Sequence, residues 1–251
     1  MASPTERFTE TVENYIKYRP SYPAEVIQVL IKECGMTEKS IIADIGSGTG
    51  ILSKLLLEQR STVYGIEPNQ AMRNAAEKYL KEYPNFISIN GAAEATRLKD
   101  CSVNIITAAT AFHWFNAEKS RVEFKRILKT SGWLMLVWNV RDTESKIMRD
   151  YENLILRYGK DYRNSKAKEF DTTATENFFK PYKMKTASFK NMQQFDWEGL
   201  KGRQLSASHS LREGDTEYDD MLKELKIIFE RYQKNGKVEF LYNTKLYYGQ
   251  L

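Results

Sequence analysis

The stretch that decides the fold is Asp44-Ile45-Gly46-Ser47-Gly48-Thr49-Gly50. It completes a short apolar run, Ile41–Ile45, that predicts a buried strand, and it precedes apolar residues at helical spacing from Ile51 onward. Glycines let the backbone turn tightly and approach a ligand, and a helix start offers N–H groups that favour an anion. The stretch therefore predicts a ligand-binding loop after the first strand of an α/β sheet. An ordinary strand–helix turn is the alternative.

The spacing of the glycines separates classes of nucleotide site. Gly46, Gly48 and Gly50 form GxGxG, whereas a dinucleotide fingerprint is GxGxxG, and the Gly-Lys step of a P-loop is absent. Glu67 ends the second predicted strand, 17 residues after Gly50. A carboxylate there can accept hydrogen bonds from both hydroxyls of a ribose, although it can also be a solvated strand end. The pair favours a ligand with a ribose and a modest anion, without a pyrophosphate.

Outward from the loop, strands are expected to alternate with helices. This alternation predicts βαβ units and a parallel sheet covered on both faces. Strands are expected over 41–45, 62–67, 86–89, 103–111, 133–140 and 238–248, and later helices over 144–157 and 218–232. The segment 141–210 is more polar, with weaker strand signals. We expect one domain over 1–251: an N-terminal flap and helix (1–40), a cofactor-binding core (41–140), an inserted substrate lobe (141–210) and a closing helix and strand (211–251).

Composition narrows the function classes. The 251 residues are 41% hydrophobic and carry a net charge of +5, which argues against a disordered chain or a dedicated nucleic-acid binder. Cys34 and Cys101 make no CxxC pair, and His113 and His209 are the only histidines, so no disulfide framework or metal site is expected. Without a bilayer-length apolar stretch or a signal-peptide pattern, a cytoplasmic protein is the default expectation.

Two motifs resemble those of the class I S-adenosylmethionine-dependent methyltransferases. Ala43–Gly50 is similar to their first motif, and Tyr64–Pro68 to their acidic second-strand motif. The resemblance covers residues 8 to 140 well and the remainder more loosely, where Asn235–Val238 looks like the usual last hairpin. It implies S-adenosylmethionine as the cofactor and a Rossmann-like, doubly wound, seven-stranded sheet, mostly parallel with the last strand antiparallel.

The resemblance also assigns cofactor-binding positions. It places the loop against the methionine part, Glu67 on the ribose, Pro68 and Met72 near the adenine and Glu94 at the adenine edge. Core packing is the alternative for Met72, and a surface charge for Glu94. Arg19 would pair with the methionine carboxylate or simply precede a rigid turn. The complete expected set is Tyr15, Arg19, Asp44, Gly46, Ser47, Gly48, Gly50, Glu67, Pro68, Met72, Ala93, Glu94 and Thr110.

Two further stretches bear on the methyl acceptor. Ala111–Phe115 and Tyr15–Pro23 resemble the small-molecule branch that includes trans-aconitate methyltransferase-like enzymes. The Asp/Asn-Pro-Pro-Tyr motif of amino-methylating enzymes is absent, so an oxygen acceptor is expected and a carboxylate favoured. His113 is the candidate base or hydrogen-bond donor, or else a structural histidine packed on a tryptophan. The expected acceptor-pocket residues are His113, Trp114, Trp138, Ser206 and Ser208.

The partners expected are a small-molecule acceptor and, at most, a second copy of the chain; neither a membrane nor a nucleic acid is expected. Two alternatives remain open. The basic segment 141–210 could dock an RNA or a protein to be methylated. The chain could also bind the cofactor without catalysis, as a sensor or scaffold.

Overall fold

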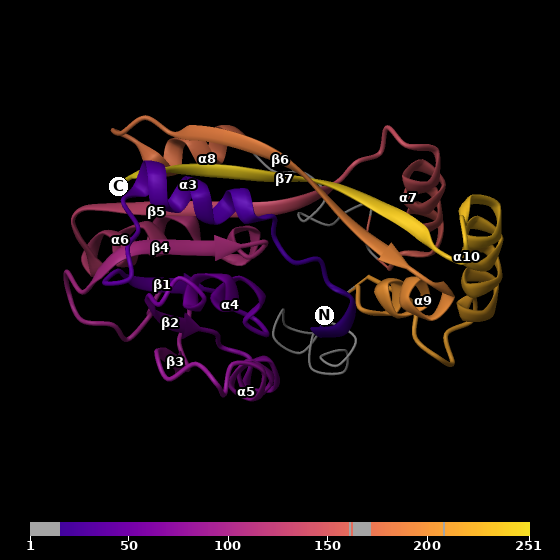
Figure 1. Cartoon of the computed structure of the whole chain (residues 1–251), viewed down its shortest axis with the longest axis horizontal. Coiled ribbons are helices and arrows are strands. Elements are labelled where there is room, and N and C mark those ends of the chain that lie inside the picture. Colours follow the sequence, from indigo (N-terminus) through magenta and orange to yellow (C-terminus); the bar gives the residue numbers. More distant parts are fainter. Residues whose placement is uncertain (1–15, 161, 163–171, 208) are drawn as a thin grey trace.

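A single sheet of strand order β3-β2-β1-β4-β5-β7-β6 organises the chain (Figure 1). The computed structural model describes residues 16–160, 162, 172–207 and 209–251. β1 to β5 pair in parallel, and β7 runs antiparallel to both β5 and β6. The predicted α/β class and mostly parallel seven-stranded sheet with an antiparallel last strand are confirmed for this part of the chain. The strands are β1 (Ile41–Ile45), β2 (Thr62–Ile66), β3 (Phe86–Ile89), β4 (Val103–Ala109), β5 (Leu128–Arg141), β6 (Lys185–Phe195) and β7 (Val238–Gln250).

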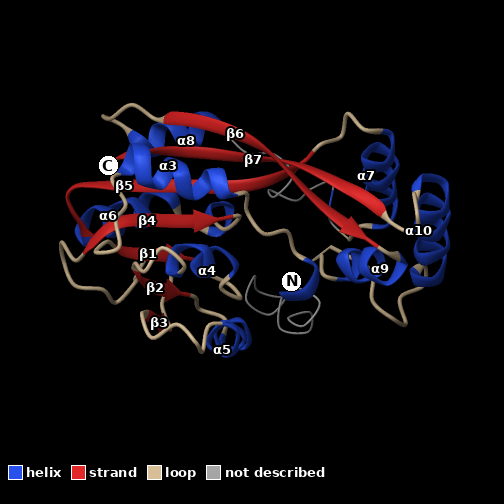
Figure 2. Ribbon diagram, in the orientation of Figure 1, coloured by secondary structure: helices blue, strands red, loops and turns tan. Residues whose placement is uncertain are grey.

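Helices cover both faces of this sheet, as βαβ connections require (Figure 2). On one face, α3 and α4 bury Leu30 and Leu56 against Ile42 of β1. On the other face, Phe124 of α6 and Phe179 of α8 pack against the sheet. α5 lies beside β3. The helices on this half of the molecule are α3 (Ala24–Cys34), α4 (Ile51–Leu57), α5 (Gln70–Tyr79), the 3-10 helix η1 (Phe112–Trp114), α6 (Ala117–Ile127) and α8 (Thr172–Phe179).

A second group of helices forms a lobe at the far ends of β6 and β7. These helices are α7 (Lys146–Tyr158), α9 (Trp197–Leu205) and α10 (Tyr218–Tyr232). Their core contains Tyr151, Leu200 and Leu225, together with Phe240 and Tyr242 from β7. The same strand contributes residues to the sheet cores at its other end. β7 therefore belongs to both halves, and Figure 2 shows it running from one to the other.

The expected boundaries divide this region differently from the structure. β6 lies inside the range 141–210 but pairs along its whole length with β7 as the edge strand of the sheet. α10 lies inside the range 211–251 but packs on α7 and α9 in the lobe. Asn235 and Gly236, expected in a hairpin, adopt φ angles of 51° and 75° in a turn that joins α10 to β7. It is thus a helix–strand turn, because no strand precedes it.

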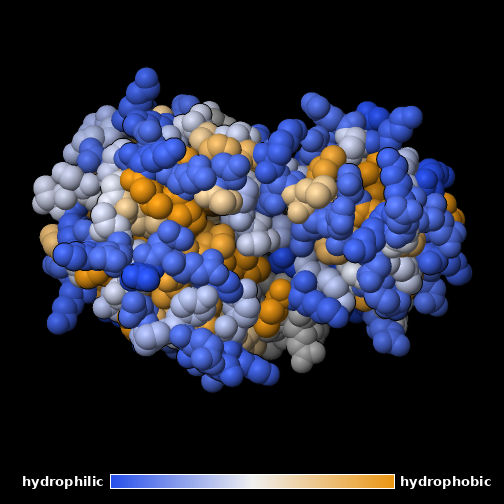
Figure 3. Space-filling view, viewed as in Figure 1, coloured by the Kyte–Doolittle hydropathy of each residue, from blue (hydrophilic) through white to orange (hydrophobic). Residues whose placement is uncertain are grey.

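Among the described residues, no helix combines the length and the apolar content needed to cross a bilayer. Most of the lobe's visible face is polar, whereas apolar side chains reach the surface over α3 and α4 (Figure 3).

Candidate functional site

The glycine loop connects β1 to α4 and is tied to the end of β2. The N–H groups of Gly46 and Ser47 both donate to the carbonyl of Ile66, at 2.8 and 3.2 Å. Gly46, Gly48 and Gly50 have φ angles of 67°, 56° and 85°, a region that side chains with a Cβ rarely adopt. The sequence therefore needs glycine at these positions to make this turn.

Glu67 lies directly after β2 and holds the loop from the other side. Its Oε2 accepts the Gly48 N–H at 3.0 Å, and its Oε1 accepts the Asn69 N–H at 2.9 Å. Burial raises the pKa of Glu67, while the two backbone hydrogen bonds and the charge of Arg73 oppose this rise. A carboxylate has about four acceptor positions. Glu67 can therefore accept two further hydrogen bonds while it stays attached to the loop.

Asp44 ends up inside the protein, where it joins three elements. Its carboxylate accepts hydrogen bonds from Ser53 Oγ of α4 at 2.7 Å and from Thr107 Oγ1 of β4 at 2.9 Å. Burial raises the pKa of Asp44 to about 6, against the effect of these hydrogen bonds. Its contacts fix the loop between α4 and β4.

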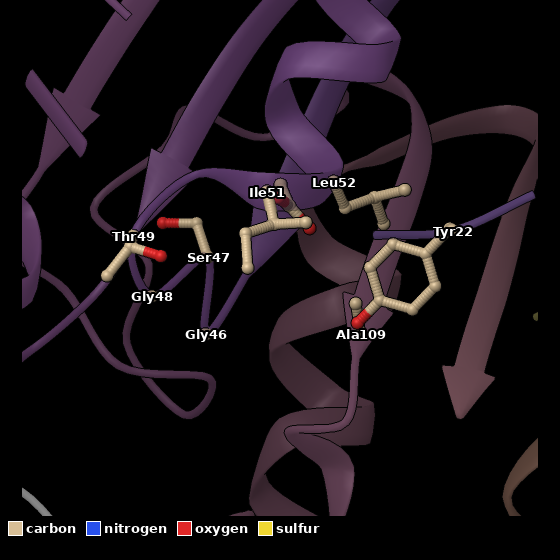
Figure 4. A pocket seen from close by; sticks show the side chains of 9 residues that line it. Tyr22, Gly46, Ser47, Gly48, Thr49, Ile51, Leu52 and Ala109 are labelled. Atoms are coloured by element: carbon tan, nitrogen blue, oxygen red, sulfur yellow. The ribbon is translucent and has the colours of Figure 1, made fainter. Parts of the chain in front are cut away.

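A hollow opens beside the glycine loop. Figure 4 shows the Tyr22 ring beside Ala109 at one side of the hollow, with Ser47 and Thr49 at the other. Thr49 Oγ1 is buried and has no hydrogen-bond partner among the described residues. The hollow therefore presents both an apolar ring and an unsatisfied polar atom to a ligand. Its lining consists of Tyr22, Asp44, Gly46, Ser47, Gly48, Thr49, Ile51, Leu52 and Ala109.

Thr110 follows β4 and carries backbone strain next to the hollow. Its φ is +53°, which is an outlier for a β-branched residue. Its N–H donates to the carbonyl of Val137 at 2.7 Å, and its Oγ1 lies 3.5 Å from the Tyr22 hydroxyl. The strained turn brings the carboxyl end of β4 and the segment before α3 together.

The expected adenine-side residues occupy different environments. Met72 and Ala93 are buried, whereas Pro68 is exposed. Glu94 Oε1 accepts the Asn116 N–H at 2.6 Å and lies 3.4 Å from Ser120 Oγ. Glu94 thus connects the loop after β3 to the start of α6.

His113 sits in η1 with its ring 4.9 Å from that of Trp114, measured between ring centres. Burial lowers the pKa of His113 to about 4, so the imidazole is neutral at pH 7. Its Nδ1 is buried and has no hydrogen-bond partner among the described residues. A neutral imidazole with an unused nitrogen can accept or donate one proton, depending on its tautomer.

Two predicted acceptor residues lie on the sheet side of the molecule. Trp114 is 39% exposed, next to His113. Trp138 is buried in β5, between the rings of Phe112 and Tyr247, with both pairs edge-on at 6.3 Å. Trp138 therefore supports η1 through Phe112.

Arg19 and Ser206 meet, although they are 187 positions apart. Arg19 Nη2 donates to the backbone carbonyl of Ser206 at 3.0 Å, and Ser206 Oγ donates to the carbonyl of Arg203 at 2.7 Å. The structure thus gives Arg19 a contact in the lobe. Tyr15 and Ser208 lie outside the described residues.

The hollow gathers some of the predicted site and adds residues that the sequence analysis missed. Asp44, Gly46, Ser47 and Gly48 line it together, while Trp138 and Ser206 do not. The residues missed are Tyr22, Thr49, Ile51, Leu52 and Ala109. Tyr22 had a usable signal, since an aromatic residue before a proline at a helix start is held in a defined position.

The comparisons with known proteins agree with this geometry. Residues 43–136 match the methyltransferase domain family. The matched range contains the glycine loop, Glu67, Thr110 and His113. S-adenosylmethionine is the cofactor that this match implies. The loop and Glu67 fit it, because a buried carboxylate beside bare backbone suits a ribose.

Similar proteins carry methyltransferase names. An uncharacterised methyltransferase of Schizosaccharomyces pombe is 32% identical over 136 residues, 54% of this chain and 53% of that protein. A Saccharomyces cerevisiae protein named as a probable S-adenosylmethionine-dependent methyltransferase is 31% identical over 156 residues, 59% of this chain and 53% of its own. The chain thus spans about half the length of these curated relatives. The YcgJ protein of Bacillus subtilis shares the fold, with a TM-score of 0.60, 19% identity, and coverage of 90% of this chain and 98% of that one.

Proposed function

We propose that this chain is a methyltransferase that uses S-adenosylmethionine to methylate a small-molecule acceptor. The single observation that carries the proposal is the Gly48–Glu67 hydrogen bond of 3.0 Å. It joins the glycine loop to the acidic end of β2 within the range that matches the methyltransferase domain. A ligand with an anionic or polar end near a helix start and a ribose near a carboxylate fits this pair.

We assign the cofactor-binding roles as follows. Gly46, Ser47 and Gly48 receive the methionine part, and Glu67 accepts the ribose hydroxyls. Asp44 and Gly50 hold the loop in shape. The remaining assignments are Thr110 beside the methionine end, with Pro68, Met72, Ala93 and Glu94 on the adenine side. The burial of Met72 and the contact of Glu94 with α6 make these two supports of the adenine side.

S-adenosylmethionine supplies a methyl group on a sulfonium, which is already a good leaving group. The chain then has to align an acceptor and exclude water from it. We assign this task to the segment around η1, with His113 next to the acceptor and Trp114 at its rim. A neutral His113 can take a proton from a hydroxyl acceptor or donate a hydrogen bond to a carboxylate. We favour a carboxylate oxygen, which needs no proton removal.

Binding and turnover test the proposal separately. Calorimetric titration with S-adenosylhomocysteine is expected to show one site per chain, and the absence of binding to folded protein contradicts the cofactor assignment. Incubation with labelled S-adenosylmethionine and a cell extract is expected to give a small product that is heavier by one CH₂. Labelled RNA or protein instead supports the macromolecular alternative, and binding without any transfer supports a non-catalytic role.

A further inference from the structure

One aromatic ring reaches the hollow from outside the glycine loop. Of the described residues that line the hollow, Tyr22 alone precedes β1; the others belong to β1, the loop, the start of α4 and the end of β4. Figure 4 shows its ring beside Ala109, across the hollow from Ser47 and Thr49. Its hydroxyl lies 3.5 Å from Thr110 Oγ1. The ring therefore occupies the side of the hollow formed by the carboxyl end of β4.

Hydrogen bonds fix the backbone on both sides of Tyr22. The Ser21 carbonyl accepts from the side-chain amides of Asn139 in β5 and Asn191 in β6, at 3.2 and 2.8 Å. The Pro23 carbonyl accepts a backbone N–H of the first turn of α3 at 3.0 Å. The ring itself packs against the core cluster of α3, α4 and β1. Because the ring is held before a ligand binds, a contact with it costs little conformational entropy.

The charges around the hollow suit a cation on this side. Among the lining residues that the structure describes there is no lysine, arginine or histidine, whereas Asp44 supplies a carboxylate. Burial raises the pKa of Asp44 to about 6, so most of this carboxylate is charged at pH 7. The start of α4 suits an anion, and it lies at the loop rather than at β4. The hollow thus fits a ligand that carries both charges at different positions.

S-adenosylmethionine is such a ligand, and the charge on its sulfur sets it apart from S-adenosylhomocysteine. When the methyl group is transferred, the sulfur keeps the electron pair of the broken S–C bond and becomes neutral. The loop and Glu67 are assigned to the amino-acid and ribose parts, which both molecules have. A residue that distinguishes the two molecules must therefore act at the sulfur.

We propose that the Tyr22 ring binds the sulfonium of S-adenosylmethionine and strengthens its binding relative to that of S-adenosylhomocysteine. The face of an aromatic ring is negative and attracts a cation within about 6 Å of its centre. This attraction comes from the ring and does not depend on what the hydroxyl contacts. The inference rests on the proposed function, because it takes S-adenosylmethionine as the ligand of the hollow. It implies that the product is held less tightly than it would be if it kept the charge.

Two substitutions at position 22 separate the ring from its hydroxyl. Tyr22→Leu removes the ring and keeps an apolar side chain, whereas Tyr22→Phe keeps the ring. Tyr182→Leu, at a tyrosine that is 48% exposed, is the matched control. Calorimetric titration measures the dissociation constants of each protein for S-adenosylmethionine and for S-adenosylhomocysteine. The quantity compared is the ratio of these two constants.

The wild type, Tyr22→Phe and Tyr182→Leu are expected to share one ratio. In Tyr22→Leu, the affinity for S-adenosylmethionine should fall about tenfold more than the affinity for S-adenosylhomocysteine. Equal weakening of both ligands overturns the inference, because a ring that only forms a wall, or that meets the ammonium group common to both, acts on them alike. An unchanged affinity for both ligands overturns it as well.

Fluorinated phenylalanines at position 22 test the same claim without removing the ring, and they replace Tyr22→Leu if that variant does not fold. Each added fluorine weakens the negative face of the ring. The affinity for S-adenosylmethionine should therefore fall stepwise while that for S-adenosylhomocysteine stays constant, and a flat series for both overturns the inference. A wild type that binds both ligands but shows no change of ratio in these variants overturns the inference alone. A wild type that binds neither ligand overturns the proposed function, and the inference falls with it.

Discussion

The hollow beside β1 and the interior of the lobe use their polar side chains differently. At the hollow, Asp44 and Glu67 are carboxylates whose hydrogen bonds come from the loop itself and from adjoining strands and helices. In the lobe, Arg203 is 4% exposed and donates to the Tyr242 hydroxyl, and the half-buried Arg141 is ion-paired with Glu152. A carboxylate with unused acceptor positions suits a ligand rich in hydroxyls. The carboxylates of the sheet half therefore keep acceptor positions for a ligand, whereas these arginines of the lobe contact elements of the lobe itself.

Burial of the Asp44 carboxylate lowers the free energy of unfolding at neutral pH, and Asp44→Asn should reveal this cost. The pKa of Asp44 is about 6 in the fold, above its ordinary 3.8, because of burial. Between these values the native state keeps a proton that the unfolded chain has released. The contribution of Asp44 to the free energy of unfolding is thus full below about pH 4 and falls as the pH rises through 6, by roughly 3 kcal/mol.

Urea denaturation of wild type and Asp44→Asn between pH 4 and pH 7 checks this. Relative to wild type, the variant should become more stable as the pH rises. The exposed-site variant Asp219→Asn should show no such trend. A constant difference between Asp44→Asn and wild type across this pH range contradicts the buried, proton-binding carboxylate.

The affinity for S-adenosylhomocysteine tests the other carboxylate of the sheet half, through Glu67→Ala. The variant loses the acceptor for ribose hydroxyls and the hydrogen bond to the Gly48 N–H. Bonds to a charged group contribute about 1.5–3 kcal/mol each, so S-adenosylhomocysteine should bind about 100-fold more weakly. Calorimetry measures this, with Glu77→Ala on the exposed side of α5 as the matched control. Equal affinities of wild type and Glu67→Ala remove Glu67 from the ribose role.

The shape of the loop can be tested with two glycines of similar φ. An alanine at Gly46 would place its Cβ 2.6 Å from that of Ala111, whereas at Gly48 it would meet nothing within 4 Å. Both variants pay about 1–2 kcal/mol for the left-handed backbone, and only Gly46→Ala adds a clash of about 1–3 kcal/mol. Chemical denaturation should therefore rank Gly46→Ala as the less stable. Equal losses would mean that Ala111 moves aside at little cost.

A smaller effect is expected from Glu94→Ala, which tests the contact between the loop after β3 and the start of α6. The variant removes the carboxylate that accepts the Asn116 N–H at the start of α6. Loss of such a helix-start contact costs about 1 kcal/mol. A drop in the free energy of unfolding of that size, with S-adenosylhomocysteine affinity nearly unchanged, marks Glu94 as a support. A large drop in affinity instead makes it a direct adenine contact.

The pKa values of the two histidines allow the two halves to be compared without any substitution. His113 lies on the sheet side and His209 in the lobe, and they are the only histidines in the chain. Nuclear magnetic resonance of labelled histidine should show His113 titrating at about pH 4 because it is buried. The pKa of His209 should also lie well below the ordinary imidazole value, because of burial and then of the neighbouring arginine charges. A His209 pKa at or above the ordinary imidazole value contradicts the burial of this side chain in the lobe.

The sheet half could be predicted because its determinants are local in the sequence. A few consecutive residues are enough to predict the turn at Gly46 to Gly50 and the buried strands β1 and β4. β6 could not, because its edge position leaves it with alternating exposed residues and many polar side chains. The burial of Arg203 could not either, since a lone arginine carries no sign of burial until α9 and β7 are packed together.

The length of β7 has a mechanical consequence. Its 13 residues pair with β6 from Val238 to Tyr248 and with β5 from Tyr242 onward, so one continuous ladder reaches from the sheet into the lobe. At about 3.4 Å per residue, that ladder is roughly 40 Å long. The lobe is attached to the sheet through this ladder, so strand register sets the distance between the hollow and the lobe. A ligand that reaches both the hollow and the lobe must therefore match a spacing fixed by the pairing of β7 with β5 and β6.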